Sequence, residues 1–526
     1  MPPTCNSTTS TSTPTKFPTT NNIPNITTTE VILFFKTINV QKATGFDKLS
    51  VRILRLALPY ICHVISCIIN LSIEEGVFPL QWKIAVVTPL HKGGSSDILS
   101  NYRPISVLPV LSKIYEKHIL SSLQTHIDLH DIINTNQSGF KKLHSCATTI
   151  QHLYSNWITE KDKKKTLVLL FLDFCKAFDS VNHHILLKKI ENIGIKCNFF
   201  KILQSFLENR FQCVKVQDCT SDILPVTCGV PQGAILSPTL FQIYINDLLS
   251  MKLNCQVHAY ADDTTFFISS NNVKHLQLQL NQDICLIQDW CAKNKMSINH
   301  TKSHYLLVNA STDCPITITV DSKKLKRNNT SKLLGFFLND SLNWKSHITH
   351  ILNKVSSNLR LFYNLRHLLN FKTSKYYYYN YIHPYIIYGV HLYYPLSRSI
   401  HTDPLYILQK KALRLICLDD QTTKTKTLST KFVVKKTNIL PLPSLSSYFT
   451  CISGFLIKNK LCPSYLSAIF KTHTKQHMTR NQHTLSSSYR LNNHNLNILT
   501  KFKSLPRMIR MTNRLLAFKK PPKYFS

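Results

Sequence analysis

Three aspartates, Asp173, Asp262 and Asp263, have the setting in this sequence that best suits catalytic chemistry. Asp173 follows the apolar run 167–172, and Asp262 and Asp263 lie within the largely apolar stretch 256–269. Carboxylates packed together repel one another unless a divalent cation neutralises them. Their oxygen donors suit Mg²⁺, and two such ions clamp the attacking and leaving oxygens of a phosphoryl displacement. This pattern indicates a nucleotidyl transferase or a nuclease. The alternative is that the Asp-Asp pair only forms a solvated hairpin turn.

The catalytic interpretation requires that the two aspartate segments lie side by side. The run 167–172 predicts a buried strand,. The stretch 256–269 predicts a hairpin with its carboxylates at the bend,. If this hairpin pairs with the strand, all three carboxylates meet at one edge of a sheet.

Helices are predicted further along the chain. Apolar residues recur at helical spacing over 273–291 and 348–369,. Asp403-Pro404 supplies an N-cap and a first-turn proline for a helix that runs to Leu418,. Strands and helices are mixed rather than strictly alternating, which favours an α+β fold over a doubly wound sheet.

The composition indicates a folded protein with a polyanionic partner. Hydrophobic residues make up 43% of the 526 residues, and 63 Lys and Arg against 27 Asp and Glu give a net charge of +36. After Asp420 there are 19 Lys or Arg and no acid. Because cations that neutralise phosphates release counterions, nucleic acid is the favoured partner. An enzyme of small neutral metabolites is disfavoured.

Several other classes of protein are disfavoured. The 16 cysteines include no Cys-x-x-Cys pair, so neither zinc fingers nor a disulfide scaffold is indicated,. No secretory signal is visible, and the least polar long window, 439–457, contains Pro441 and Pro443 and is a poor membrane span,. We therefore expect an intracellular protein without a membrane partner. Of the first 29 residues, 23 are Ser, Thr, Pro or Asn, which predicts a disordered tail,.

A set of motifs extends the argument from the aspartates to a family. Tyr260-Ala261-Asp262-Asp263 resembles the YxDD box of reverse transcriptases. Six further segments resemble that family's other motifs and occur in its order: Asn101–Ser106, Gln137–Phe140, Leu172–Asp179, Gly229–Pro238, Asn299–Lys302 and Leu333–Gly335. These variants, with Gln409–Ile416 beyond them, are most similar to the reverse transcriptases of non-LTR (LINE-type) retrotransposons of the Jockey/CR1-like group.

The resemblance implies an α+β right-hand polymerase. Fingers would span residues 30–165, a catalytic palm built on an antiparallel sheet 166–320, and a primer grip with a helical thumb 321–420. Residues 421–526 would form a basic helical extension, and residues 1–29 the tail.

The resemblance also assigns roles to individual residues. Asp173, Asp262 and Asp263 would be the catalytic ligands of two Mg²⁺ ions, with Mn²⁺ as a substitute, and Lys302 a proton donor to pyrophosphate. The residues implied in nucleotide binding are Arg103, Phe174, Phe178, Gln232 and Gly233, with Phe178 selecting deoxynucleotides. Those implied in primer positioning are Tyr260, Leu334 and Gly335. Lys92 is a further candidate for the triphosphate, although its loop would equally suit a solvated lysine.

The expected function is RNA-directed DNA synthesis. The protein would copy template RNA into cDNA from the 3′-hydroxyl of a DNA primer, using deoxynucleoside triphosphates, in the nucleus and/or the cytoplasm. Only a low-complexity tail precedes the fingers, so either an endonuclease would act in trans or this chain would be a truncated copy. Too few acids follow residue 400 for an RNase H. The alternative is a catalytically silent nucleic-acid-binding relic or domesticated protein. A viral RNA-dependent RNA polymerase is disfavoured by Phe178 and Ala261, and a group II intron maturase by the motif variants.

Overall fold

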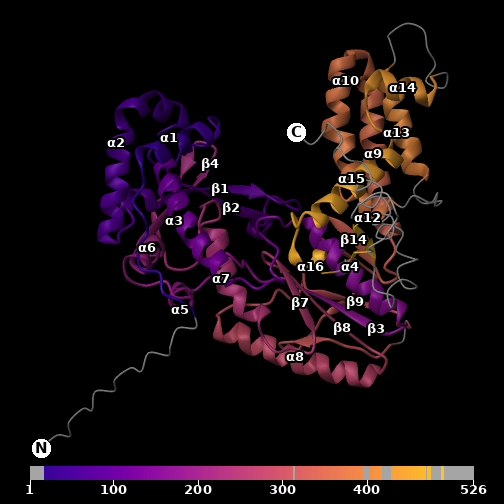
Figure 1. The fold of residues 1–526 in the computed structure, drawn as a ribbon, viewed down its shortest axis with the longest axis horizontal. Coiled ribbons are helices and arrows are strands. Elements are labelled where there is room, and N and C mark those ends of the chain that lie inside the picture. The colour runs from indigo at the N-terminus through magenta and orange to yellow at the C-terminus, as the bar shows by residue number, and fades with distance from the viewer. Residues whose placement is uncertain are drawn as a thin grey trace, which may run out of the picture. The chain divides into compact units, whose positions relative to one another are not determined.

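The computed structural model describes residues 17–311, 314–394, 403–417, 428–468, 471–474 and 487–490, the last two ranges as backbone only. The chain forms two compact units (Figure 1). Unit 1 contains residues 1–140, 173–253 and 283–299, and unit 2 contains residues 141–172, 254–282 and 300–526. Both units are therefore built from separate stretches of chain. The ranges predicted for fingers, palm and thumb do not coincide with these two units, and they stay predictions.

Unit 1 is organised around a five-stranded sheet. Its strands are β1 (Ile84–His91), β2 (Tyr102–Val107), β4 (Arg210–Val216), β5 (Cys219–Thr220) and β6 (Leu224–Val226). Strand β1 pairs antiparallel with β2, with Leu90 opposite Arg103, and parallel with β4. The sheet thus joins the segment that carries Arg103 to a strand more than 100 residues later in the sequence.

Helices supply most of the remaining structure of unit 1. They are α1 (Thr28–Thr37), α2 (Val51–Glu75), α3 (Val110–Leu129), α5 (His183–Asn192), α6 (Cys197–Leu207) and α7 (Ser237–Leu249), with the 3₁₀ turns η1 (Leu80–Lys83) and η2 (Leu99–Asn101). Their starts follow from local chemistry, because Ser50 and Asn182 accept backbone N–H groups at the starts of α2 and α5,. Helix α2 ends at Gly76, which takes the left-handed conformation with φ 72°,.

The prediction of a disordered tail over residues 1–29 is wrong for its described part. Ile23 and Ile26 are 4% and 5% exposed, and Thr20 bonds through its backbone to Gly194 and Lys196. Thr27 and Glu30 then form the capping box that starts α1,. The averaged composition hides these two isoleucines, and their burial against unit 1 orders the segment. Residues 1–16 lie outside the described residues.

Unit 2 contains the predicted strand and hairpin in one sheet. The strand order is β12 (Lys326–Arg327), β9 (His304–Val308), β3 (Thr166–Leu172), β8 (Asp263–Ser270) and β7 (Gln256–Tyr260). All neighbours are antiparallel except β12 and β9, which are parallel. Strand β3 is central and its residues 167–172 are at most 7% exposed. The buried strand, the hairpin and the α+β class are therefore confirmed, and the sheet is antiparallel but for its edge pair.

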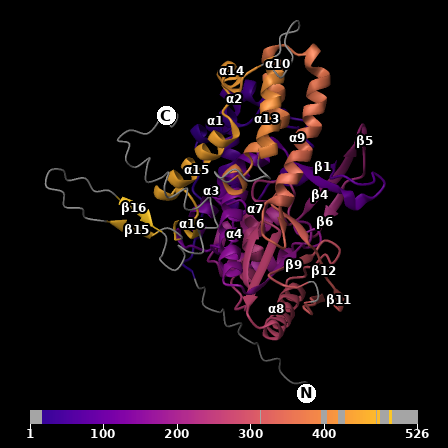
Figure 2. The same ribbon diagram turned by 90° about the vertical axis from the view of Figure 1, so that its right-hand side faces the viewer.

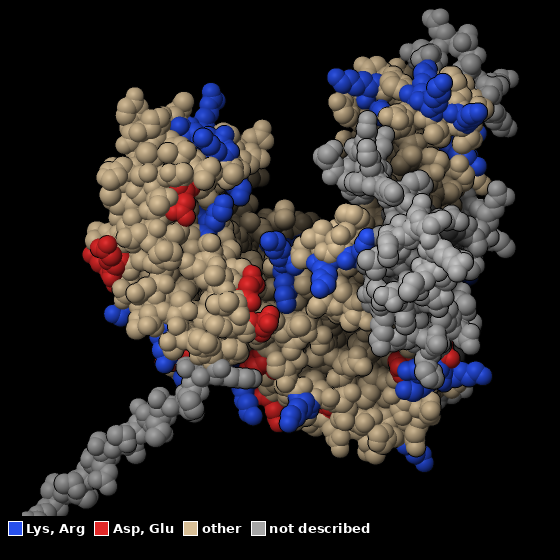
Figure 3. Space-filling model, viewed as in Figure 1, with Lys and Arg blue, Asp and Glu red and all other residues tan. Residues whose placement is uncertain are grey.

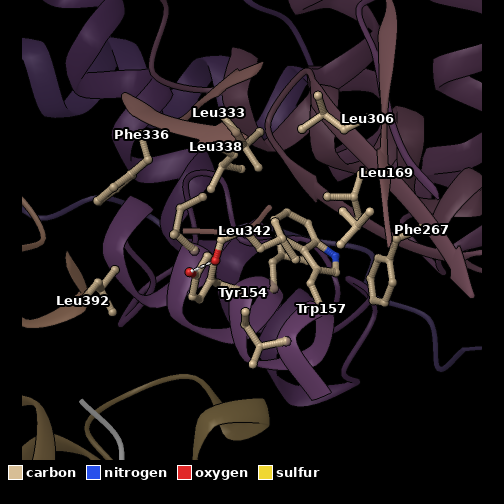
Figure 4. Close-up of a cluster of buried hydrophobic side chains, with 14 of the residues drawn as sticks. Tyr154, Trp157, Leu169, Phe267, Leu306, Leu333, Phe336, Leu338, Leu342 and Leu392 are labelled. Carbon is tan, nitrogen blue, oxygen red and sulfur yellow. Dashed lines mark hydrogen bonds between the residues drawn. The ribbon is translucent and has the colours of Figure 1, made fainter. Parts of the chain in front are cut away.

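One face of this sheet packs on helix α4 (Cys146–Asp162). Trp157 of α4 is fully buried among side chains of the sheet, including Leu169 and Phe267 (Figure 4). The hydroxyl of Tyr154 donates a hydrogen bond to the backbone oxygen of Leu342 at 2.5 Å. This cluster also includes Leu333, Phe336 and Leu338 of the hairpin β13 (Thr330–Leu333) and β14 (Phe336–Asn339). A single apolar core thus supports both hairpins that carry predicted site residues.

Long helices complete unit 2. Helix α8 (Val273–Lys293), which continues into unit 1, and α9 (Lys345–Leu365) confirm two predicted helices. Helix α13 (Asp403–Ile416) confirms the third predicted helix. Cys417 after it is a turn, and Leu418 lies outside the described residues. Helices α9 and α13 lie side by side (Figure 2) around a second apolar cluster.

The other elements of unit 2 are short. They are β10 (Thr319–Val320), β11 (Lys323–Lys324), η3 (Arg366–Leu368), α10 (Phe371–Tyr377), the π-turn η4 (Tyr378–Ile382), α11 (His383–Ile387), α12 (Val390–Tyr393), α14 (Thr430–Thr437), α15 (Leu442–Lys458), α16 (Ser464–Ser467), β15 (Lys471–Thr474) and β16 (Ser487–Arg490). The described part of the predicted basic extension is therefore largely helical.

Candidate functional site

The register of β3 and β8 determines where the predicted catalytic aspartates lie. Leu172, the last residue of β3, is paired with Thr264 of β8, and Tyr260 is paired with Asp263 across the β7–β8 turn. Asp173 follows Leu172, and Asp263 precedes Thr264, so the two aspartates come directly after the last β3–β8 pair at the same end of the strands. The turn residues are Ala261 and Asp262, and Ala261 takes φ 58°, which a two-residue hairpin turn requires of its first residue,. The backbone thus brings both aspartate segments to one end of the sheet.

The chemistry of these side chains fits a hard divalent cation. Asp173 and Asp262 are partly buried and Asp263 is exposed. Within the described ranges, no three His, Cys, Asp or Glu side chains are arranged as a complete metal site. Mg²⁺ is commonly held by one or two carboxylates together with substrate phosphates, so a complete protein cage is not needed. The donor set therefore fits Mg²⁺ as an ion that binds together with substrate.

The segment after Asp173 is fixed by backbone pairing inside unit 1. The backbone N–H of Asn299 donates to the oxygen of Asp173 at 2.7 Å, and Phe174 forms an isolated bridge with Ile298. The Phe174 side chain is only 4% exposed and its ring lies 6.2 Å from that of Trp290. Its side chain is therefore part of the core, and its predicted role in nucleotide binding stays a prediction. Any contact from this position would come from the backbone.

Phe178 has a different setting. Its ring is partly exposed and stacks on Phe241 of α7 at 4.4 Å and 19°, with the edge of Phe140 at 6.4 Å. These contacts with Phe241 and Phe140 restrict the rotation of the Phe178 ring, which stays partly exposed,. A ring held in this way is suited to steric selection.

The loop Gly229–Leu236, which precedes α7, carries Gln232 and Gly233. Gly233 has φ 145°, and a Cβ built there would lie 2.3 Å from the backbone oxygen of Ser106 on β2. The N–H of Ser106 donates to the oxygen of Gln232 at 2.9 Å. The absence of a side chain at Gly233 is thus required by the close approach of β2. The predicted role of Gly233 in nucleotide binding stays a prediction.

Gln232 is oriented by a residue that the motif contained but to which no role was assigned. Its Nε2 donates to the Oδ1 of Asp179 at 2.8 Å. Burial raises the pKa of Asp179, while the bond from Gln232 and the charges of Lys176 and Lys92 oppose that rise. Asp179 therefore joins the loop to the cationic loop of Lys92.

Glu116 of α3 anchors the other end of the loop. It is 0% exposed, and its Oε2 accepts the backbone N–H groups of Ile235 at 2.6 Å and Leu236 at 3.3 Å. Complete burial raises the pKa of Glu116, and the hydroxyl of Ser112 and the charge of Arg210 oppose that effect. Arg210 is itself 2% exposed, and burial lowers its pKa to about 10. A buried carboxylate thus holds the start of α7, where unpaired N–H groups favour negative charge.

Arg103 and Lys92 occupy the exposed side of unit 1. Arg103 lies on β2 opposite Leu90, and the N–H of Lys92 donates to the oxygen of Asn101 at 2.8 Å. Both side chains are exposed. They place positive charge at the surface on β2 and on the loop that follows β1.

The three residues predicted to position a primer are connected within unit 2. The hydroxyl of Tyr388 donates to the oxygen of Leu334 at 2.6 Å, and its ring would lie 3.2 Å from a Cβ at Gly335. The thiol of Cys146, at the start of α4, contributes to raising the pKa of both Tyr388 and Tyr260. Burial is the larger cause and the Cys146 thiol the smaller, and together they raise the pKa of Tyr260 to about 12. Cys146 and Tyr388 thus link the Tyr260 hairpin to the Leu334–Gly335 turn.

Lys302 is the remaining residue with a predicted catalytic role. It is exposed in the segment before β9, two residues after His300, whose Nε2 is 3.2 Å from Asp321. Its predicted role as a proton donor stays a prediction.

A comparison with known families places these observations in context. Residues 90–338 match the family described as reverse transcriptase (RNA-dependent DNA polymerase). The chain is therefore similar to reverse transcriptases over this segment. The match includes all three aspartates, the loop Gly229–Leu236 and the Leu334–Gly335 turn.

The chain is also similar to curated retrotransposon proteins. The chain is 29% identical over 403 residues to the RNA-directed DNA polymerase from mobile element jockey of Drosophila melanogaster, covering 74% of this chain and 44% of that protein. It is 26% identical over 401 residues, with the same coverage, to the probable RNA-directed DNA polymerase from transposon BS of that species. The predicted resemblance to the non-LTR group is therefore confirmed. The chain spans less than half the length of these relatives.

Among solved structures, apo telomerase from Candida tropicalis matches 76% of this chain and 71% of its own at 14% identity, with a TM-score of 0.38. A similarity at this TM-score does not establish a common fold.

Sequence reasoning missed four residues that lie against the predicted site residues and help to position them: Glu116, Asp179, Cys146 and Tyr388. Each is distant in sequence from the residue it positions. The one visible signal was an acid of α3, Glu116, at a position where helical spacing predicts the buried face,.

Proposed function

We propose that this protein is an RNA-directed DNA polymerase that extends a DNA primer on an RNA template, as in non-LTR retrotransposition. The proposal is carried by one observation: within the domain match, the β3–β8 register leads Asp173 and Asp263 toward the same end of the sheet. The structural roles of fingers, palm and thumb belong to the same proposal. They would fall to the segments predicted for them.

In this proposal Asp173 and Asp262 hold the metal ions, and Asp263 is the third carboxylate. Bound Mg²⁺, or Mn²⁺ in its place, would lower the pKa of the primer 3′-hydroxyl and neutralise charge on the leaving pyrophosphate. The primer oxygen forms a bond to the α-phosphorus as the bond to pyrophosphate breaks. Lys302 would supply the proton that pyrophosphate takes up.

The nucleotide would be bound from unit 1. Arg103 and Lys92 are exposed cations, and the planar guanidinium of Arg103 suits phosphate oxygens,. Gln232 and Gly233 would contact the base pair or the sugar from a loop held by Asp179, Ser106 and Glu116. The ring of Phe178 would exclude a ribose 2′-hydroxyl.

The primer end would be positioned by Tyr260 and by the Leu334–Gly335 turn, which Cys146 and Tyr388 connect. Template RNA, primer DNA and deoxynucleoside triphosphates are the proposed partners. An endonuclease acting in trans and a location in the nucleus or cytoplasm complete the proposal.

The test is primer extension on an RNA template with Mg²⁺ and either deoxy- or ribonucleoside triphosphates. We expect the wild type to incorporate deoxynucleotides, and Asp262→Asn to lose about a thousandfold or more of this activity while binding template–primer normally. Asp218→Asn, at an exposed aspartate outside the site, is the matched control and should be unaffected. Equal binding without synthesis by either protein would support the relic alternative instead. Efficient use of ribonucleotides by the wild type would indicate an RNA polymerase.

A further inference from the structure

Helix α2 of unit 1 exposes a row of large apolar side chains. Ile53, Leu56, Tyr60, Val64, Ile68 and Leu71 are 55%, 75%, 85%, 53%, 43% and 55% exposed. Their spacing of three and four residues places them on one face of the helix. Over α2, the surface in Figure 3 is mostly tan. A contiguous apolar surface of this kind marks an interaction site more often than an ordinary solvent face. We call these six residues the α2 stripe.

The opposite face of α2 is firmly packed inside unit 1. Val51, Leu54, Ile65, Ile69 and Ile73 are at most 5% exposed. The guanidinium of Arg55 donates to backbone oxygens at the end of α1, among them Phe35 at 2.6 Å and Ile38 at 2.5 Å. By length and composition alone α2 could cross a membrane, as could the bent pair α14–α15. A membrane-spanning α2 would lose the contacts of its buried face with unit 1. The stripe is therefore better explained by a partner that contacts only the exposed face of α2.

The stripe is symmetric about its own centre. The steps between its residues are three, four, four, four and three. If a second α2 lies antiparallel across a two-fold axis at position 62, Ile53 faces Leu71, Leu56 faces Ile68, and Tyr60 faces Val64. A two-fold interface between identical copies must be complementary to itself in this way.

The charges on α2 are consistent with the same arrangement. No Lys, Arg, Asp or Glu occurs between Leu56 and Ile73 in a chain of net charge +36. Exposed Arg52 lies at the start of the helix, and exposed Glu74 and Glu75 lie at its end. None of these three forms an ion pair within the part of the chain that the structure describes. An antiparallel partner would bring Arg52 of one copy to the acidic end of the other.

We propose that the α2 stripe is the interface through which two copies of this chain form an antiparallel dimer. The stripe is about 27 Å long at 1.5 Å per residue. Val77 and Leu80, 45% and 57% exposed, lie just beyond the end of α2. A specific interface typically buries about 800 Å² on each partner. Two-fold pairing of α2, with these flanking residues, provides apolar surface on that scale.

The first experiment measures mass by sedimentation velocity over a wide range of concentration. The full chain is treated with nuclease and kept at high salt, because bound nucleic acid could bridge copies and like charges would repel them. We expect a dimer for the wild type and a dissociation constant at least about a hundredfold weaker for Leu56→Glu, which buries two charges across the axis. The matched control is Leu129→Glu, since Leu129 is also a helical leucine and is 74% exposed. A monomer at every concentration for the wild type would overturn the proposal.

A charge exchange tests the antiparallel geometry. Arg52→Glu alone, and the pair Glu74→Arg with Glu75→Arg alone, should each weaken the dimer, while the triple variant should restore it. Failure of that rescue would refute the antiparallel pairing.

A vesicle assay tests the other occupant. If the wild type is monomeric and sediments with phosphatidylcholine vesicles, and Leu56→Glu does not, the stripe binds a lipid surface instead. None of these measurements depends on polymerase activity, so they stand or fall separately from the proposed function.

Discussion

The carboxylate end of the unit 2 sheet and the loop Gly229–Leu236 of unit 1 are held in place by different forces. Asp262 and Asp263 lie on a hairpin whose position follows from strand register and from the apolar core beneath it. The loop has no strand partner of its own. It is held by polar contacts to Asp179, to the backbone of Ser106 and to buried Glu116.

This difference predicts how each region fails. Substituting a carboxylate on the hairpin should remove chemistry and leave the fold intact, because the strands hold the backbone. Substituting a support of the loop should damage folding and nucleotide binding together, because the loop's geometry depends on single buried contacts.

Glu116→Ala should have the largest effect on stability. It leaves two buried backbone N–H groups without an acceptor, which should lower the free energy of unfolding by about 2–5 kcal/mol,. Urea denaturation measures this loss. Glu116→Gln, which keeps an acceptor, should lose less, and Glu191→Ala on the exposed part of α5 should change little. A small effect at Glu116 would show that polar contacts do not hold the loop.

Acid should weaken unit 2 in a defined pH window. Burial lowers the pKa of His152 to about 4 and, with the charge of His152 opposing protonation, that of His258 to about 3. Between pH 6.5 and 4 the unfolded chain binds protons that the folded chain does not, so stability falls as pH falls through that range. For His152 alone the loss is on the order of 3 kcal/mol.

Hydrogen exchange of β7, β8 and α4, measured from pH 7 to 4, would follow this loss. His152→Gln should flatten the pH dependence, whereas His275→Gln, at an exposed histidine of α8, should not. Unchanged protection of these elements at pH 4 would contradict buried neutral histidines in this core.

Phe178→Ala should change selectivity without unfolding the protein, because the ring is only partly buried. Removing the ring should raise ribonucleotide use relative to deoxynucleotide use by about ten- to hundredfold. Competing incorporation on an RNA template measures the ratio. Phe337→Ala, at a partly exposed ring in unit 2, is the control. An unchanged ratio would remove Phe178 from the nucleotide site.

Tyr388→Phe should have the smallest effect. It removes the hydrogen bond to the oxygen of Leu334 and leaves the ring beside Gly335, a change worth about 1 kcal/mol,. We expect the KM for template–primer to rise about threefold to tenfold while the KM for deoxynucleotides stays constant. Tyr385→Phe, in α11, should leave both values unchanged. A rise in the nucleotide KM instead would assign the Leu334–Gly335 turn to the nucleotide.

The parts of the molecule that could be predicted from sequence are those determined by local pattern. The run 167–172, the hairpin around Asp262 and the helices α8 and α9 carry their period within a few residues, and all are observed. Sequence reasoning missed Glu116, Cys146 and Tyr388 because their partners are between 54 and 242 residues away in the sequence. Only folding brings them together, as Tyr388 and Leu334 illustrate. Ile23 was missed because averaging over a polar segment hides one side chain that the core accepts.

The central claim is that Asp173 and the Asp262–Asp263 turn serve one metal-binding site. Fe²⁺ in place of Mg²⁺ generates hydroxyl radicals that cut the backbone beside the bound ion. With template–primer and a deoxynucleotide present, we predict cuts near both residue 173 and residues 262–263, competed by Mg²⁺ and lost together in Asp262→Asn. Cuts near only one of the two segments, or cuts near 173 that persist in Asp262→Asn, would contradict a shared site.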